Sequence, residues 1–181
     1  QITLVKPRFG VSSIYTFDII MDTDNNAECR YDIDDNLEYD FMQRFTVTSG
    51  IRHTIKDFSG ISNGDQRPHR LFVKCKDNVF GTTAKSFDLN VDTTAPQIKT
   101  TFAFPNPVVE KPMTTTLTVE TDEPVLCKYS TKFTDFDVME NKFDNFDNNT
   151  FRTINRQLIS IVNVGSYTYN VACMNKAEIS S

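Results

Sequence analysis

The chain has 181 residues and a formal net charge of −5 at pH 7, with no tryptophan. An acidic balance without a basic run argues against nucleic acid as a partner. The apolar stretches are much shorter than the roughly 20 residues of a membrane-spanning helix, which argues against membrane insertion in this segment. No signal peptide or lipidation motif is visible, so an extracellular protein would be represented here by a mature or excised segment.

The four cysteines form two pairs with one spacing. Cys29 and Cys75 are 75 − 29 = 46 positions apart, and Cys127 and Cys173 are 173 − 127 = 46 positions apart. The second pair follows the first by 127 − 29 = 98 positions, and the neighbours repeat with it: Cys-Arg-Tyr becomes Cys-Lys-Tyr, and Val-Lys-Cys becomes Val-Ala-Cys. An internal repeat fixes the domain count. We therefore predict two domains that are copies of one fold, residues 1–95 and 96–181.

The spacing predicts one disulfide within each domain. Closing a loop of this size stabilises a domain by roughly 4 kcal/mol in the chain-entropy model, and domains of about 90 residues have modest cores that need such support. Disulfides indicate an oxidising compartment. The alternatives are four reduced, buried cysteines in a cytosolic protein, or a zinc site. Zinc is disfavoured because there is no C-x-x-C motif and both histidines lie in the first half.

Alternation of apolar and polar residues predicts short strands throughout the chain. A turn-rich cluster at 22–26 separates two of them, which indicates a hairpin or an inter-sheet corner, and residues 121–124 repeat this turn. Residues 52–58 and 151–158 are more polar and are expected near a sheet edge. The predicted strands are 2–5, 17–21, 27–31, 52–58, 71–75 and 86–91 in the first half, and 117–120, 125–129, 151–158 and 167–173 in the second.

After the strand that carries the first cysteine of each domain, the apolar residues are spaced three and four positions apart. That spacing predicts a helix of one to three turns whose aromatic face covers the flank of the β-structure. A groove for a partner helix is the alternative. The residues concerned are Leu37, Phe41 and Phe45 in the first half, and Phe133, Phe136, Met139 and Phe143 in the second.

The two copies differ after their second cysteine. From Cys75 to Asp92 there are 92 − 75 = 17 residues, enough for a turn and a last strand, whereas 181 − 173 = 8 residues follow Cys173. We expect the last strand of the second domain to be incomplete, either because the chain is a fragment or because another chain supplies the strand by edge addition. The link between the domains, 92–96, is short and stiffened by proline, which favours an extended pair.

Together these patterns predict an all-β fold of two sandwiches with about seven strands each. The segments 121–130 and 165–173, the turn 75–81 and the junction 92–96 resemble those of immunoglobulin-like or fibronectin-III-like repeats in prokaryotic surface proteins. The resemblance implies two tandem immunoglobulin-like β-sandwiches in which each disulfide joins the third and sixth strands of one sheet. The second copy departs from the pattern at 174–178, where Asp77 and Gly81 have no match, so we expect a differently shaped turn there.

Candidate chemistry is sparse. The chain has no Gly-x-Ser-x-Gly elbow, and His53, expected in an edge strand, and His69, expected in a loop, are more simply structural or exposed than catalytic. Carboxylates are dense in the turns of the first half, and calcium favours several oxygen ligands from flexible loops. No EF-hand loop is present, however, and solvated turn acids are the favoured explanation of the cluster. The weak calcium candidates are Asp22, Asp24, Asp32, Asp34 and Asp92.

Asn148 begins an Asn-Asn-Thr sequon in an Asn-rich stretch, and we expect it to be exposed and open to glycosylation. The loop 60–68 is longer than its counterpart around 162–165 and is the best candidate for contacts specific to one domain, although a tolerated insertion would look the same.

The resemblance implies spacers, stalks and adhesive arms, so we expect a non-enzymatic structural or adhesive part of an extracellular or cell-surface protein. The expected partners are other surface proteins, further copies of this chain, or a glycan. Two alternatives stay open: a subunit of a surface filament or layer assembled by donor-strand addition, and an accessory module of a secreted hydrolase.

Overall fold

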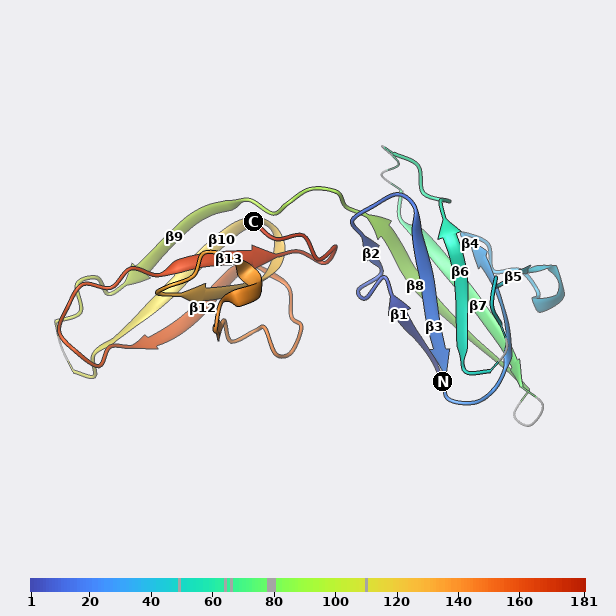
Figure 1. The fold of residues 1–181 in the computed structure, drawn as a ribbon, viewed down its shortest axis with the longest axis horizontal. Coiled ribbons are helices and arrows are strands. Elements are labelled where there is room, and N and C mark those ends of the chain that lie inside the picture. Colours follow the sequence, from blue (N-terminus) through green and yellow to red (C-terminus); the bar gives the residue numbers. More distant parts are fainter. Residues whose placement is uncertain (49, 64, 66, 78–80, 110) are drawn as a thin grey trace. The chain divides into compact units, whose positions relative to one another are not determined.

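The computed structural model describes residues 1–48, 50–63, 65, 67–77, 81–109 and 111–181. Strand accounts for 52% of the chain and helix for 3%, so the fold is all-β. The chain divides into two compact units, Gln1–Thr93 and Thr94–Ser181, which are called unit 1 and unit 2 below. The boundary lies within the segment 92–96 (Figure 1).

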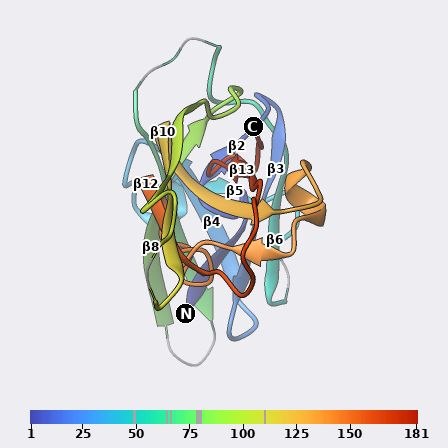
Figure 2. The same cartoon turned by 90° about the vertical axis from the view of Figure 1, so that its left-hand side faces the viewer.

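The described residues of unit 1 form two sheets and one short helix. The first sheet has three strands in the order β1-β3-β6, and the second has five in the order β2-β8-β7-β4-β5. Figure 2 shows β3 and β6 on one side of the unit and β8 on the other. The bounds are β1 Ile2–Lys6, β2 Val11–Ser12, β3 Phe17–Thr23, β4 Glu28–Ile33, η1 Tyr39–Phe41, β5 Gln43–Arg44, β6 Arg52–Phe58, β7 His69–Asp77 and β8 Gly81–Val91.

Both sheets of unit 1 contribute to a single apolar core. Alternate residues of each strand point inward, as the period of two requires: Ile19 and Met21 of β3 are fully buried, as are Leu71 and Val73 of β7. Leu89 of β8 packs into the same cluster. Since the strands before and after the turn 24–27 belong to different sheets, that turn is an inter-sheet corner and not a hairpin.

Unit 2 is organised around one long strand. The N-terminal half of β10 pairs with β9 and β12, and its C-terminal half pairs with β11 and β13. The turn predicted at 121–124 is wrong, because β10 runs through these residues with only a shift of register between Glu120 and Val125. The bounds are β9 Ile98–Phe104, β10 Thr114–Ser130, η2 Phe136–Val138, β11 Asn141–Lys142, β12 Arg152–Ser160 and β13 Asn170–Met174.

The two predicted disulfides are confirmed. Cys29 bonds to Cys75 and Cys127 bonds to Cys173. Each joins directly opposed positions of two neighbouring antiparallel strands, β4 with β7 and β10 with β13. Both bonds therefore lie within one sheet. They indicate an oxidising environment.

The predicted helices are much shorter than expected. Each is a 3₁₀ turn of three residues, Tyr39–Phe41 and Phe136–Val138. The expected aromatic face is only partly formed, because Phe41 is 80% exposed and Phe133 is 44% exposed, whereas Phe45 and Phe143 are buried. A single 3₁₀ turn cannot maintain the three- and four-residue periodicity of a long α-helical face. Among the described residues, no helix is long and apolar enough to cross a membrane.

Candidate functional site

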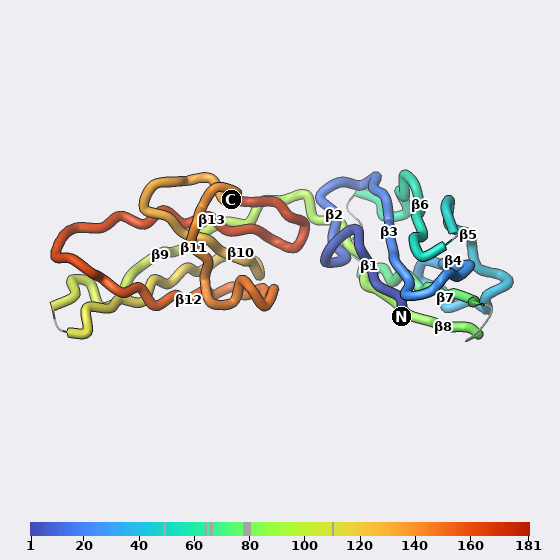
Figure 3. The backbone as a smooth tube through the Cα atoms, turned by 60° about the horizontal axis from the view of Figure 1, so that its bottom comes forward, coloured from blue at the N-terminus to red at the C-terminus, as the bar shows by residue number. Residues whose placement is uncertain are grey.

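The most distinctive surface of unit 2 is the outer edge of β13. One side of this strand pairs with β10, from Leu126↔Met174 to Ser130↔Asn170. In unit 1 the corresponding strand, β7, is flanked on both sides, by β4 and by β8. Among the described residues, β13 has no second full strand beside it. Figure 3 shows the end of the chain returning next to β13.

The register of β13 against β10 determines which of its N–H and carbonyl groups face this edge. The carbonyl of Cys127 accepts from Phe143 on the β11 side, so the Cys127–Cys173 pair is not hydrogen-bonded across the ladder. The N–H and carbonyl of Cys173 point outward and bond to Ser181, at 3.0 and 2.9 Å. Outward groups recur every second residue of an antiparallel strand. The N–H and carbonyl of Val171 therefore face the open edge.

A buried asparagine builds the turn that precedes Ser181. Asn175 is fully buried, and its side-chain oxygen accepts from the N–H groups of Ala177 and Ile179 at 3.0 and 3.1 Å. Its amide donates to the carbonyl of Thr94 at 2.9 Å. The turn brings Ser180 opposite Met174.

The register of this turn matches that of unit 1. Ser180 pairs with Met174, and the positions 98 earlier, Thr82 and Lys76, pair in the same way. The ends of the two turns also correspond, since Asp77 pairs with Gly81 and the N–H of Asn175 bonds to the carbonyl of Ile179. Residues 78–80 lie outside the described residues, so the expected difference in turn shape stays a prediction.

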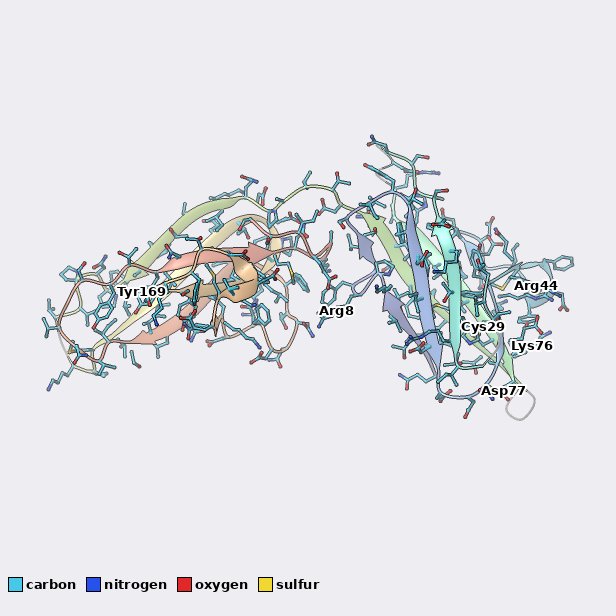
Figure 4. All side chains as sticks on the ribbon, viewed as in Figure 1. Arg8, Cys29, Arg44, Lys76, Asp77 and Tyr169 are labelled. Atoms are coloured by element: carbon cyan, nitrogen blue, oxygen red, sulfur yellow. A yellow bond between two sulfur atoms is a disulfide. The ribbon has the colours of Figure 1, made fainter. Side chains whose placement is uncertain are left out.

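A hollow of about 510 Å³ lies beside the open edge. Tyr169, labelled in Figure 4, lines it next to β13. The lining mixes apolar and polar residues from three segments: Ala103 and Pro105 to Val108; Met113 and Thr115; and Ile161, Asn163 to Tyr167 and Tyr169. Val164 is 95% exposed. Exposed apolar groups gathered in a concave surface are typical of binding sites.

Unit 1 has a strand in the corresponding place. β8 pairs with β7 from Asp77↔Gly81 to His69↔Leu89, and its last residues pair with β2. Leu89 is 1% exposed, and Phe87 and Val91 pack against the core. In β7, next to β8 in the sheet, Leu71 and Val73 are 0% and 1% exposed, whereas their counterparts in unit 2, Tyr169 and Val171, are only partly buried.

The five calcium candidates are not gathered into one site. Asp22 accepts two hydrogen bonds of 2.8 Å from the guanidinium of Arg52, which lowers the pKa of that carboxyl. Asp24 pairs with the amino group of Gln1. Asp32 lies in β4, and Asp92 follows β8. Among the described residues, no three His, Cys, Asp or Glu side chains are placed to hold a metal ion.

Asp34 belongs to a network around His69. The imidazole of His69 is 3% exposed, with Nδ1 2.8 Å from Asp34 and Nε2 3.2 Å from Asp65. Partial burial raises the pKa of Asp34, but the hydrogen bonds from the Arg70 backbone and from His69 outweigh it and lower that pKa. Through its contact with His69, Asp65 connects the loop 60–68 to the start of β7. Residues 64 and 66 of this loop lie outside the described residues. The expectation that His69 lies in a loop is wrong, since it begins β7 and is buried.

His53 is also buried. It is 0% exposed in β6, and its two ring nitrogens lie 3.2 Å from the hydroxyls of Thr23 and Thr48. The expected edge strand is correct, because β6 borders its sheet. Asn148 is exposed in the loop between β11 and β12.

Sequence reasoning missed Asn175 and the hollow. The repeat itself contained a usable signal for the turn, because positions 98 apart on either side of it pair alike. No family model matches the chain, and no curated protein matches its sequence.

Proposed function

We propose that this chain is a non-enzymatic structural or adhesive segment of an extracellular, cell-surface protein, built from two immunoglobulin-like β-sandwiches of the kind found in prokaryotic surface repeats. The observation that carries the proposal is the disulfide at the same strand position in each unit. Each bond joins two strands that pair antiparallel, so it keeps a small core closed when the unit is strained. Each unit thus stays folded and can serve as a spacer outside the cell.

Mechanical consequences follow from the loop size. Each disulfide closes a segment with a sequence separation of 46 residues. A fully extended chain spans about 3.4 Å per residue, so each bond withholds roughly 150 Å of extension from a unit pulled through its ends. A tethering protein with such bonds stays short under load, which suits a stalk or adhesive arm.

The proposal can be tested on intact cells of the source organism. A membrane-impermeant amine reagent should label the protein from outside, and thiol alkylation should modify its cysteines only after reduction. Deleting the coding sequence should weaken attachment of the cells to surfaces or to one another. Labelling only after lysis, or free thiols in the native protein, would contradict the proposal.

A second candidate function is that of a subunit in a surface filament or layer assembled by strand addition, in which the described residues of β13 pair with β10 on one side and with an added strand on the other. Sheet edges with free N–H and carbonyl groups are templates for another chain. This function predicts assemblies whose size grows with protein concentration, measured by light scattering at fixed ionic strength. A monomer at every concentration, with no strand-donating partner in extracts, would exclude it.

A further inference from the structure

We propose that the outer face of the β9-β10-β12 sheet in unit 2 is a docking surface for the same face of a second copy of this chain. The contact is a face-to-face association of two sheets and not the addition of a strand. For its use in adhesion the inference rests on the proposed function, whereas the docking itself does not. The exposed apolar side chains of the face belong to Phe102, Phe104, Ile154 and Leu158, which are between 41% and 74% exposed.

The register of the three strands places these side chains on one side of the sheet. Phe104 lies opposite Thr116, and Thr116 lies opposite Leu158 on the other flank of β10. Directly opposed residues point to the same side of a sheet, and so do alternate residues of one strand. Phe102 and Ile154 therefore point the same way as Phe104 and Leu158. The intervening residues of β10 point into the apolar core of unit 2.

The corresponding face of unit 1, on the β1-β3-β6 sheet, has its charges paired. Arg52 of β6 donates two hydrogen bonds of 2.8 Å to Asp22, which lies opposite it in β3. Lys56 of β6 donates to Asp18 at 2.8 Å. Charged side chains keep this face hydrated, and each charge already has its partner within the unit.

Unit 2 has apolar residues where unit 1 has these two cations. Shifted by 98 positions, the two aspartates become Glu120 and Thr116. Glu120 lies opposite Ile154, and Thr116 lies opposite Leu158. The outer face of unit 2 consequently exposes apolar surface to water in place of ion pairs, and an exposed apolar patch of this kind is typical of an interaction surface.

The charges on the outer face of unit 2 indicate what covers it. Glu120 and Arg156 are both exposed there, and among the described residues neither has an ion-pair partner. Arg156 lies opposite Thr118, two positions along β10 from Glu120. Two-fold symmetry makes every contact twice, so a copy that brings its Glu120 to Arg156 also brings its Arg156 to Glu120. The face is thus complementary to itself in charge, and we assign it to a second copy.

The size of the face predicts a weak dimer. Three strands about 4.8 Å apart, each about as long as the seven residues of β9, cover roughly 14 Å by 23 Å. That area is smaller than the roughly 800 Å² that each partner buries in a standard interface. We expect a Kd between about 10 μM and 1 mM. Weak contacts of this kind gain strength when many copies stand side by side on a surface.

The direct test is sedimentation equilibrium of the disulfide-bonded 181-residue chain at concentrations from about 10 μM to 1 mM. It should show a reversible equilibrium that stops at the dimer, because an isologous contact is closed. Glu120→Arg alone and Arg156→Glu alone should each weaken association at least about 10-fold, since like charges then meet across the contact. An equimolar mixture of these two variants should associate as well as the wild type, because one face is then positive and the other negative.

Matched changes in unit 1 provide the controls. Arg44→Glu alters an exposed residue of β5 and changes the net charge exactly as much as Arg156→Glu, yet it should leave association unchanged. Phe102→Ser should weaken association at least about 10-fold, because docking buries the ring. Phe41→Ser removes a phenylalanine of unit 1 that is 80% exposed and should have no effect. Circular dichroism should show that every variant keeps the wild-type fold.

Three results would overturn the inference. The first is a wild type that stays monomeric up to about 1 mM, the result expected if a glycan or an unrelated protein covers the face. The second is a mixture of the two charge variants that stays monomeric. The third is an equal loss of association in Arg44→Glu and Arg156→Glu. None of these results changes whether the protein is labelled on intact cells, so the inference can fail while the proposed function stands.

Discussion

The strands β7 and β13 carry the second cysteine of their units, yet their surroundings differ. β7 lies between β4 and β8, and Leu71 and Val73 are completely buried beneath that arrangement. β13 pairs with β10 on one side. On its other side, Ser180 pairs with Met174 and Ser181 bonds to Cys173. Tyr169 and Val171 therefore remain partly exposed.

Some features of the two units follow from the local sequence pattern, and others follow from the adjacent strand of the sheet. The disulfide and the pairing of the cysteine-bearing strands occur at the same positions in both units, because they depend on the spacing of 46 and on the period of two. Burial of the strand that carries the second cysteine depends on a further neighbour. In unit 1 that neighbour is β8. Unit 2 should consequently be the less stable unit, and the predictions below test that difference.

Removing each disulfide should give the largest effect. Cys127→Ser with Cys173→Ser should cost about 4 kcal/mol, by loop-closure entropy, and leave unit 2 unfolded at 37 °C. Cys29→Ser with Cys75→Ser should cost unit 1 a similar amount but leave it folded, since its core extends over both sheets. Scanning calorimetry of the wild type and both double variants would assign the two transitions. Loss of unit 1 before unit 2 would contradict the comparison.

Trimming one corresponding valine in each unit should give the next largest difference. Val73→Ala removes two buried methyl groups and should destabilise unit 1 by about 2 kcal/mol, including the cavity left behind. Val171→Ala should cost unit 2 less than half as much, because that side chain is only partly buried. Urea unfolding monitored by tyrosine fluorescence would measure both values. Equal losses would mean that the edge of β13 is already covered.

The pH dependence should differ between the units because both histidines of the chain lie in unit 1. Burial lowers the pKa of His53 below its ordinary value of 6.5. The unfolded state therefore binds a proton more readily, so stability is complete above pH 6.5 and falls as the pH drops below it, by at most about 1.4 kcal/mol per pH unit. His53→Gln should flatten this decline between pH 7 and 5.

His69 is retained in both proteins, so the difference between wild type and His53→Gln reports on His53 alone. The groups that face the His53 ring are the hydroxyls of Thr23 and Thr48 and the ring of Phe45, with the charge of Asp22 nearby. Thermal melts at pH 5, 6, 7 and 8 would give the comparison. Identical pH profiles for the two proteins would show that His53 does not titrate in this range.

The positions of the strands were largely predictable from the sequence, because alternation and turn residues are local signals. The burial of His53 was not, since its sequence neighbours are polar and only the packing of Thr23 and Phe45 from other segments encloses it. The prediction of two helices was wrong for a related reason. Spacings of three and four around Phe41 and Phe136 suggest a helix, but each segment makes a single turn before the chain joins β5 or β11.

The candidate site was only partly predictable. Counting residues after Cys173 predicted an incomplete last strand in unit 2, and that expectation stays a prediction. The hollow was not foreseen, because it is formed by three segments that are far apart in the sequence and each looks like an ordinary loop or strand end. Nor was the role of Asn175, whose side chain bonds to Thr94, Glu123, Ala177 and Ile179, residues that become its neighbours only in the folded unit.

The smallest effect should come from glycosylation of Asn148. The sequence contains one Asn-x-Ser/Thr sequon without proline at its middle position, and that sequon lies in unit 2. Asn148 is exposed between β11 and β12, in a loop where the side chain of the buried Asn145 donates to the carbonyl of Thr150. Secretion from a eukaryotic host should add one glycan there, detected by mass spectrometry and removed by Asn148→Gln.

The glycan should leave the unfolding temperature of unit 2 within about 2 °C of the unmodified protein, because surface changes away from packed groups alter stability by roughly 0.5 kcal/mol or less. Unit 1, which has no sequon, is the internal control. A larger loss confined to unit 2 would mean that the loop around Asn148 packs against the unit more closely than its exposure indicates. That result would also place the weakness of unit 2 in this loop, and the contrast between β7 and β13 would no longer explain it.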